Sequence, residues 1–246
     1  MSEQTPKFFL RRAEFRSGKL MLDRDARKKL VRVLRLSVGD SIEVLAPGKK
    51  WECRISAVPK EGVELEAVRE LPAPPAPRCE LVLGQAIPKG DRFDWLIQKA
   101  TELGVSEIYP LITERTIVRP NRPAAKMQRW NQISDQAAAQ CEGAVPTYVH
   151  EPQPLHQFLQ SKQPGLRILL HEREGYLSLR SLLDNVRESR ITFVVGPEGG
   201  WAPAESAALV RAGYARIRLG HRVLRSDTAG LALAAILQYC CGDFSE

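Results

Sequence analysis

The stretch VVGPEGGWAPAE, Val194 to Glu205, decides how this sequence of 246 residues is expected to fold. It leads from an apolar, β-branched run, which predicts a buried strand, through three glycines into a segment with helical spacing. Glycine adopts positive φ and lets other atoms approach the backbone closely, so the junction suits a pocket made of main-chain groups. A plain turn would use the same glycines. In both cases the stretch predicts a strand, a loop and a helix in succession.

The same rhythm continues on both sides of this stretch. Apolar runs predict strands at residues 80–87, 106–113, 166–172, 190–195 and 215–220. Segments with helical spacing lie between and after them, at residues 92–104, 124–140, 155–161, 204–213 and 228–240. Strands that alternate with helices predict an α/β domain with a parallel sheet, whose ligands bind at the carboxyl ends of the strands. Three loops that follow strands, at 169–175, 194–200 and 219–228, are therefore expected to meet at one edge.

The common phosphate-binding loops are absent from the sequence. It contains no G-K-[ST] tripeptide, which excludes a Walker A loop, and no G-x-G-x-x-G. The glycines of a dinucleotide-binding fold would follow the first strand of the domain, whereas here they cluster near the C-terminus. The sequence therefore predicts a pocket for another kind of small ligand.

A proline-rich segment, ELPAPPAPR at Glu70 to Arg78, divides the chain because it favours extended polyproline II. Before it, KKLVRVLRL at 28–36 predicts a helix, and alternating residues at 51–58 and 63–68 predict strands. We therefore predict two domains, a small β-barrel-like domain over residues 1–72 and the α/β domain over residues 73–246. Residues 7–35 hold 11 basic and 3 acidic side chains, which favours a polyanion such as nucleic acid as partner; a merely solvated basic surface is the alternative.

The rest of the composition excludes several classes of protein. No apolar run approaches the roughly 20 residues that cross a bilayer, and MSEQTPKFFLRR lacks the uninterrupted apolar stretch of a signal peptide. The expected location is the cytoplasm, with no membrane partner. The 5 cysteines form no C-x-x-C pair, so reduced thiols are expected, with no disulfide framework and no metal site.

Four segments spread over most of the chain together resemble the RsmE family of 16S ribosomal RNA uracil-N3 methyltransferases, members of the SPOUT superfamily. They are VVGPEGGWAPAE, RLGHRVLRSDTA, IQKATELGVSEIYPLITER and KKLVRVLRLSVGD. The resemblance implies an N-terminal PUA-like barrel that binds RNA and a C-terminal α/β domain with a parallel sheet and a trefoil knot. It also implies a homodimer that transfers a methyl group from S-adenosylmethionine (SAM) to N3 of a uridine in the 16S rRNA of the small ribosomal subunit.

The resemblance further implies which residues hold the cofactor. SAM would lie among the three strand-end loops, against Leu170, His171, Gly196, Gly199, Gly200, Leu219, Gly220, Val223 and Leu224. The chain departs from the family pattern at Glu142 and Gly143, which stand where a Gly-Arg pair is usual. The contact that the arginine of this pair would make in the family is therefore not expected in this chain.

Transfer to N3 requires that uracil lose its N3 proton, because the neutral nitrogen is a poor nucleophile. Arg225 is predicted to stabilise the negative charge that develops on the uracil carbonyls, with Arg222 as a second candidate. Glu198 acts either as a general base or as a brace that holds its loop through main-chain hydrogen bonds. Asp227 is expected to cap the last helix.

The RNA phosphates are expected to bind basic side chains, namely Lys7, Arg11, Arg12, Arg32, Arg35 and Arg222. Two other functions remain open at this point. One is a SPOUT enzyme that methylates a ribose 2′-hydroxyl, and the other is a non-catalytic RNA-binding assembly factor. Cofactor binding distinguishes the assembly factor from the enzymes, and the position of the methyl group distinguishes the two enzymes.

Overall fold

The computed structural model of the chain describes residues 5–11, 13–73, 75–141, 145–172, 177–184, 186 and 188–245. The chain forms two compact units, one of residues 1–76 with 138–145 and the other of residues 77–137 with 146–246. Residues 138–145 follow most of helix α3 (Pro123–Gln140) in sequence but belong to the first unit. The chain therefore passes from one unit to the other more than once.

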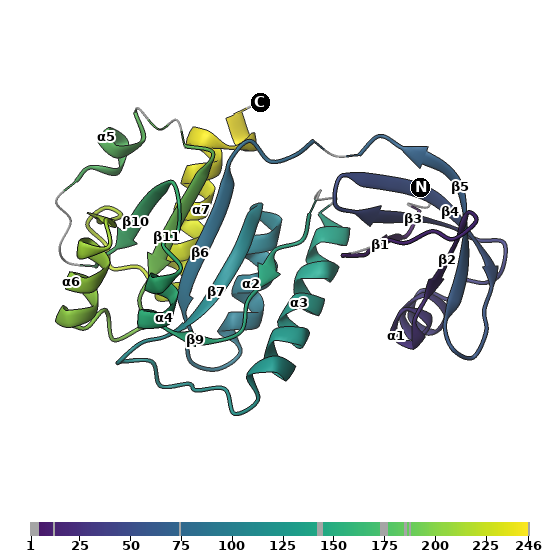
Figure 1. Cartoon of the computed structure of the whole chain (residues 1–246), viewed down its shortest axis with the longest axis horizontal. Coiled ribbons are helices and arrows are strands. Elements are labelled where there is room, and N and C mark those ends of the chain that lie inside the picture. Colours follow the sequence, from purple (N-terminus) through teal and green to yellow (C-terminus); the bar gives the residue numbers. More distant parts are fainter. Residues whose placement is uncertain are drawn as a thin grey trace. The chain divides into compact units, whose positions relative to one another are not determined.

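The first unit is built on a five-stranded sheet in the order β1-β3-β4-β5-β2 (Figure 1). Its strands are β1 (Lys7–Phe9), β2 (Lys19–Leu22), β3 (Ser41–Ala46), β4 (Lys49–Ala57) and β5 (Val63–Leu71). Strands β3, β4 and β5 are antiparallel neighbours, as their alternating side chains predict. The helix predicted at 28–36 begins earlier and ends earlier than expected. It consists of α1 (Arg24–Arg27), which continues directly as the π-helix η1 (Lys28–Val33).

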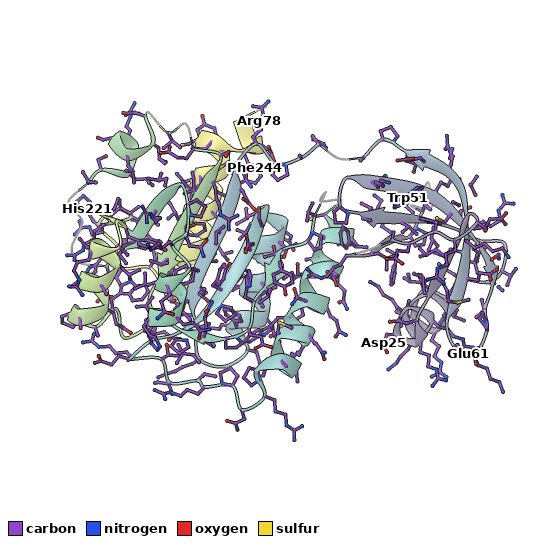
Figure 2. The ribbon with its side chains drawn as sticks, viewed as in Figure 1. Asp25, Trp51, Glu61, Arg78, His221 and Phe244 are labelled. Carbon is purple, nitrogen blue, oxygen red and sulfur yellow. The ribbon has the colours of Figure 1, made fainter. Side chains whose placement is uncertain are left out.

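One face of this sheet carries the core of the first unit. Buried side chains of the strands, such as Ile42 and Ile55, pack with Leu30 of η1, and all three are 0% exposed. At the margin of this core the rings of Trp51 and Phe15 lie 4.9 Å apart, and Figure 2 labels Trp51. The apolar residues of the π-helix thus hold it against the strands.

The second unit contains a parallel sheet in the order β12-β10-β11-β6-β7-β8, with β9 beside β7 (Figure 1). The strands are β6 (Glu80–Ala86), β7 (Val105–Ile112), β8 (Tyr148–Val149), β9 (Gln153–Pro154), β10 (Leu166–Leu170), β11 (Arg190–Val195) and β12 (Ala215–Ile217). The central strands β6 and β11 are buried almost throughout, which explains their continuous apolar sequences.

Helices cover both faces of this sheet. Phe93, Trp130 and Leu233 show that α2 (Arg92–Glu102), α3 and α7 (Ser226–Cys241) share the larger core. Phe158 and Leu209 show that α4 (Leu155–Gln160) and α6 (Pro203–Arg211) pack in the core of the other face. The last described element is η2 (Asp243–Ser245), whose Asp243 carboxylate accepts a hydrogen bond from the backbone N–H of Arg78 near the start of β6. Figure 2 labels Arg78 and, beside it, Phe244 of η2.

The predicted fold class is confirmed: a small β unit precedes an α/β unit with a parallel sheet. Helix α5 (Leu179–Leu183) was not predicted, and none of its residues is buried. The cysteines are free thiols, and burial raises the pKa of Cys53 and of Cys79 to about 11. In the described part of the chain, no helix is both long enough and apolar enough to span a membrane.

Candidate active site

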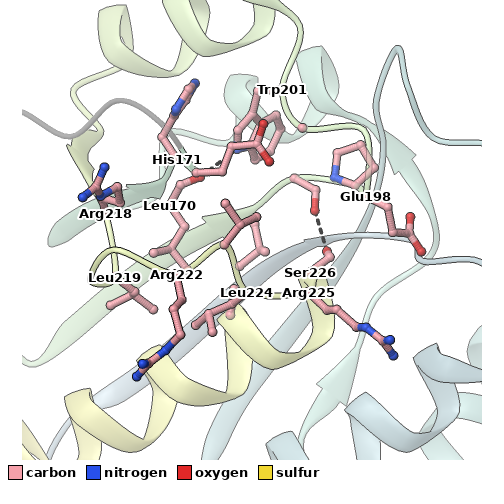
Figure 3. A pocket seen from close by; sticks show the side chains of 17 residues that line it. Leu170, His171, Glu198, Trp201, Arg218, Leu219, Arg222, Leu224, Arg225 and Ser226 are labelled. Atoms are coloured by element: carbon pink, nitrogen blue, oxygen red, sulfur yellow. Dashed lines mark hydrogen bonds between the residues drawn. The ribbon is translucent and has the colours of Figure 1, made fainter.

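The ends of β10, β11 and β12 open into one pocket of about 250 Å³ in the second unit (Figure 3). The first loop contributes residues 170–172, the second residues 195–201 without Gly199, and the third residues 218–229 in part. These are the three loops that were expected to meet at one edge of the sheet. A pocket at the carboxyl ends of parallel strands is the usual place for a ligand in this architecture.

Trp201 explains one of the glycines in the central loop. A Cβ atom on Gly196 would lie 3.1 Å from the Trp201 indole, closer than most real contacts, so the ring needs a glycine beneath it. The indole Nε1 in turn donates a hydrogen bond of 3.0 Å to the carbonyl oxygen of Leu170 in the neighbouring loop. Gly200 has a φ of +71°, which favours glycine for a separate reason. The glycines therefore shape the loop itself as well as the space above it.

A buried chain of polar groups fixes the floor of the pocket. The hydroxyl of Ser226 donates to the carbonyl oxygen of Gly196 at 2.5 Å and accepts from the side-chain amide of Gln85 at 2.7 Å. Gln85 is 0% exposed and also donates to the carbonyl oxygen of Ala86. These bonds join β6, the loop after β11 and the start of α7, so they hold the three elements in register.

Two further loops of the second unit hold the segment GPEGG from its other side. The Glu198 carboxylate accepts a hydrogen bond of 3.0 Å from the backbone N–H of Lys89, between β6 and α2. The Arg115 guanidinium, between β7 and α3, donates to the carbonyl oxygen of Gly199 at 2.7 Å. Glu205 adds a third tie, because its carboxylate accepts from the backbone N–H groups of Glu114 and Ala202.

Basic side chains stand around the mouth of the pocket. Figure 3 shows Arg225 and Glu198 extending toward the same side, whereas Arg222 extends to another side. Arg225 is the N-cap residue of α7, and its side chain makes no capping hydrogen bond. The expectation that Asp227 caps this helix is wrong, because the helix begins at Ser226 and Asp227 lies in its first turn.

The structure brings together most of the residues predicted to bind the cofactor. The lining includes Leu170, His171, Gly196, Gly200, Leu219, Val223 and Leu224, together with the two catalytic candidates Arg225 and Glu198. Gly199 and Gly220 belong to the same loops but do not line the pocket. The sequence did not indicate the lining residues Glu172, Val195, Pro197, Trp201, Arg218, Ser226 and Ala229, although all of them except Ala229 are adjacent to residues that it did indicate.

The residues predicted to bind RNA are divided between the units. Arg222 lines the pocket, whereas Lys7, Arg11, Arg32 and Arg35 belong to the first unit. Lys7 lies 4.0 Å from Glu43, and Arg35 is exposed with a φ of +58°. Arg12, like Glu142 and Gly143, lies outside the described residues.

The lining suits SAM in both shape and charge. Leu170, Leu219 and Leu224 offer an apolar wall of the kind that an adenine ring needs. The lining also includes the carboxylate of Glu172, which would suit the positive groups of SAM, and the cations of Arg218 and Arg222, which would suit its carboxylate. In the described part of the chain, no group of three or more His, Cys, Asp and Glu side chains is placed to hold a metal ion.

A separate polar cluster lies near the amino ends of the strands, at the opposite edge of the sheet. Arg190 forms ion pairs with Glu80 and Glu107 at 2.5 Å and 2.7 Å, and His150 lies 2.6 Å from Glu107. The hydrogen bond from His150 and the contacts of Arg190 lower the pKa of Glu107 to about 2. Burial and the nearby carboxylate raise the pKa of Tyr109 to about 12. The ion pairs of this cluster join β6, β7 and β11.

Comparison with known proteins shows that this chain is a methyltransferase that acts on RNA. Residues 74–238 match the family model of an RNA methyltransferase domain, and residues 30–68 match that of an RNA methyltransferase PUA domain. The Synechocystis protein named ribosomal RNA small subunit methyltransferase E is 35% identical over 214 residues, which are 84% of this chain and 69% of that protein. The chain therefore belongs to the ribosomal RNA small subunit methyltransferase E family.

Two solved structures carry the same fold with the cofactor in place. The family member from Neisseria gonorrhoeae, bound to SAM, is 30% identical with a TM-score of 0.86 over 98% of this chain and 100% of that one. A Legionella pneumophila protein in complex with SAM is also 30% identical, with a TM-score of 0.89 over 98% of this chain and 100% of that one.

Proposed function

We propose that this chain transfers a methyl group from SAM to N3 of a uridine in the 16S rRNA of the small ribosomal subunit. The observation that carries the proposal is the pocket at the ends of β10, β11 and β12, with Arg225 and Glu198 at its mouth. Family membership makes the chain a SAM-dependent rRNA methyltransferase, and relatives of the same fold were solved with SAM bound.

SAM, when bound, supplies a methyl group on a positively charged sulfur. The three loops would hold it through Leu170, His171, Gly196, Gly200, Leu219, Val223 and Leu224, mainly with backbone groups, while Gly199 and Gly220 shape the same loops outside the lining. The tryptophan and the buried Gln85–Ser226 pair keep these loops in one arrangement, so the nucleophile meets a fixed methyl position. In this proposal the α/β domain of residues 73–246 carries the transfer, and its knot encloses the cofactor loops.

Arg225 makes uridine N3 reactive. When N3 loses its proton to solvent, negative charge spreads onto the two flanking carbonyl oxygens, and a guanidinium beside them stabilises that anion. The new N3–carbon bond then forms as the bond from sulfur to the methyl carbon breaks. Glu198 acts as a brace rather than as the base, because its carboxylate already accepts the backbone N–H of Lys89. It keeps GPEGG aligned while Arg225 faces the uracil.

The target base must leave its stack before N3 can reach the methyl group. The domain of residues 1–72 binds the flanking RNA through Lys7, Arg11, Arg12, Arg32 and Arg35, and Arg222 contacts the RNA near the pocket. The working form is a homodimer in the cytoplasm, where ribosomal subunits of a bacterial cell are found. Support for the dimer comes from α7, where Tyr239 remains 67% exposed and Ile236 36% exposed on an otherwise apolar helix.

Nucleoside analysis by mass spectrometry tests the proposal. Small ribosomal subunits from a strain that lacks this gene are incubated with the protein and isotopically labelled SAM, and their rRNA is digested to nucleosides. The proposal expects one labelled nucleoside that co-elutes with 3-methyluridine. A labelled 2′-O-methylated nucleoside, or no labelled nucleoside, contradicts it.

A further inference from the structure

Two loops beside the pocket carry an excess of basic side chains that the proposed function has not used. The loop between β6 and α2 covers residues 87–91 and is followed by Arg92, the first residue of α2, and the loop between β7 and α3 covers residues 113–122. Together the two loops and Arg92 hold 5 basic residues, Lys89, Arg92, Arg115, Arg119 and Arg122, against 2 acidic ones, Asp91 and Glu114. All five basic residues are exposed.

Both loops touch the segment GPEGG directly. The backbone N–H of Lys89 donates to Glu198, and Arg115 donates to the carbonyl oxygen of Gly199. Because both loops follow parallel strands, they lie at the same edge of the sheet as the pocket. Figure 3 shows Arg225 extending toward the same side as Glu198, so these loops border the side on which the uracil is proposed to bind.

The longer loop is held in place while its arginines face solvent. Thr113 and Thr116 exchange hydrogen bonds across its first turn, and Val118 packs against the main core. Among the described residues, no ion pair or hydrogen bond engages the side chains of Arg119 and Arg122. At the opposite edge, by contrast, Arg190 is neutralised by two glutamates. Cations that stay unpaired on an anchored loop beside a pocket favour an anionic ligand.

We infer that these two loops form a second RNA-backbone site, on the α/β unit itself, which binds the phosphates next to the target uridine. This inference rests on the proposed function and names part of its substrate contact. The loops bind phosphate and not bases, since the exposed side chains of Arg119 and Arg122 have no partner among the described residues that would fix them for base recognition. Their ties to Glu198 and Gly199 place the bound strand beside the cofactor segment.

The double variant Arg119→Glu/Arg122→Glu tests the inference. Neither side chain is packed, and an acidic residue near the start of α3 suits the helix dipole, so the variant is expected to fold normally. The matched control is Lys162→Glu/Arg211→Glu, which changes the net charge equally at two exposed positions that precede β10 and β12 at the opposite edge. Binding to small ribosomal subunits from a strain lacking the gene is measured without SAM, in a salt series from about 50 to about 250 mM.

The inference expects the Arg119/Arg122 variant to bind roughly tenfold or more weakly at the lowest salt, with a salt slope smaller by about one to two. The control variant keeps the wild-type slope. Equal losses in the two variants overturn the inference, because they reflect net charge alone, and so does a wild-type protein that fails to bind the subunits. Because binding is read without methylation, the result stands apart from the proposed function: a wild type that binds but forms no 3-methyluridine contradicts only the latter.

Discussion

The carboxylate of Glu198 accepts a hydrogen bond from the backbone N–H of Lys89 at 3.0 Å, which ties the cofactor segment to the loop that follows β6. A carboxylate engaged in this way can serve as a brace, and an amide oxygen can replace it in that role. Glu198→Gln is therefore expected to keep kcat within about threefold of the wild type, whereas loss of a general base costs about 10²- to 10⁴-fold. Glu198→Ala is expected to weaken SAM binding. Steady-state kinetics with calorimetry of SAM binding measures both, and a kcat loss of a hundredfold in Glu198→Gln returns the residue to the role of base.

Arg225→Ala is expected to lower kcat by about 10²- to 10³-fold, because the cation acts on charge that develops in the transition state. The affinity for SAM is expected to stay nearly unchanged, since the Arg225 side chain makes no capping bond whose loss would disturb α7. Arg211→Ala, at an exposed position at the end of α6, is the matched control. Calorimetry with SAM beside single-turnover rates separates the two effects. If Arg225→Ala keeps the wild-type kcat, Arg225 is not the stabilising cation and another residue has that role.

Glu107 is expected to make the free energy of unfolding depend on pH in the acid range. Its pKa is about 2 in the folded chain against an ordinary value of 4.5, so its contribution is complete above about pH 5 and is lost as the pH falls toward 2. Glu107→Gln is expected to lower the free energy of unfolding by about 2 kcal/mol at pH 7. The difference from the wild type shrinks as the pH approaches 3.

Urea unfolding at several pH values measures this change. Glu61→Gln, at an exposed turn of the first unit, is the control and is expected to leave the curve unchanged. A difference between Glu107→Gln and the wild type that stays constant from pH 7 to pH 3 contradicts the electrostatic explanation.

The exposed apolar residues of α7 predict self-association. Light scattering is expected to give about twice the chain mass of 27.5 kDa. The double variant Ile236→Asp/Tyr239→Asp is expected to shift the protein toward the monomer, because it places charges on the proposed interface. A wild-type protein that is monomeric at micromolar concentration and still methylates RNA argues against a functional dimer.

The strand and helix pattern of the second unit was predictable because each segment has a strong period, and the buried strand β11 shows this well. The shape of the site was less predictable. The sequence suggested that Gly196 leaves room for a ligand, but its position also accommodates Trp201, a contact that depends on how the chain turns after β11. Capping was misjudged for a related reason. Asp227 is of a residue type that often caps helices, but α7 already begins at Ser226, so that Arg225 is the N-cap residue. Ser226 is held there by hydrogen bonds to Gln85 and Gly196, which belong to other elements.

Tertiary contacts also explain what the sequence could not indicate in the first unit. The segment at 28–36 has helical spacing, but this spacing does not distinguish an α-helix from the π-helix that forms, in which Leu30 packs against the sheet. The hydrogen bonds from Lys89 and Arg115 to GPEGG join loops that are more than eighty residues apart in the chain, so no local sequence pattern predicts them. These long-range bonds are the reason that the loops after β6 and β7 belong to the site.

Primer extension on small-subunit rRNA tests the central claim most directly, because methylation at N3 blocks the base-pairing edge of uracil while methylation of a ribose leaves it free. The template comes from a strain that lacks this gene and is copied before and after incubation with the protein and SAM. We predict one new stop for reverse transcriptase at a uridine, which appears only with the active protein and is stronger on assembled subunits than on naked RNA. An alkali-resistant linkage without a stop contradicts the claim in favour of a ribose methyltransferase, and the absence of any mark contradicts it in favour of an RNA-binding protein without this activity.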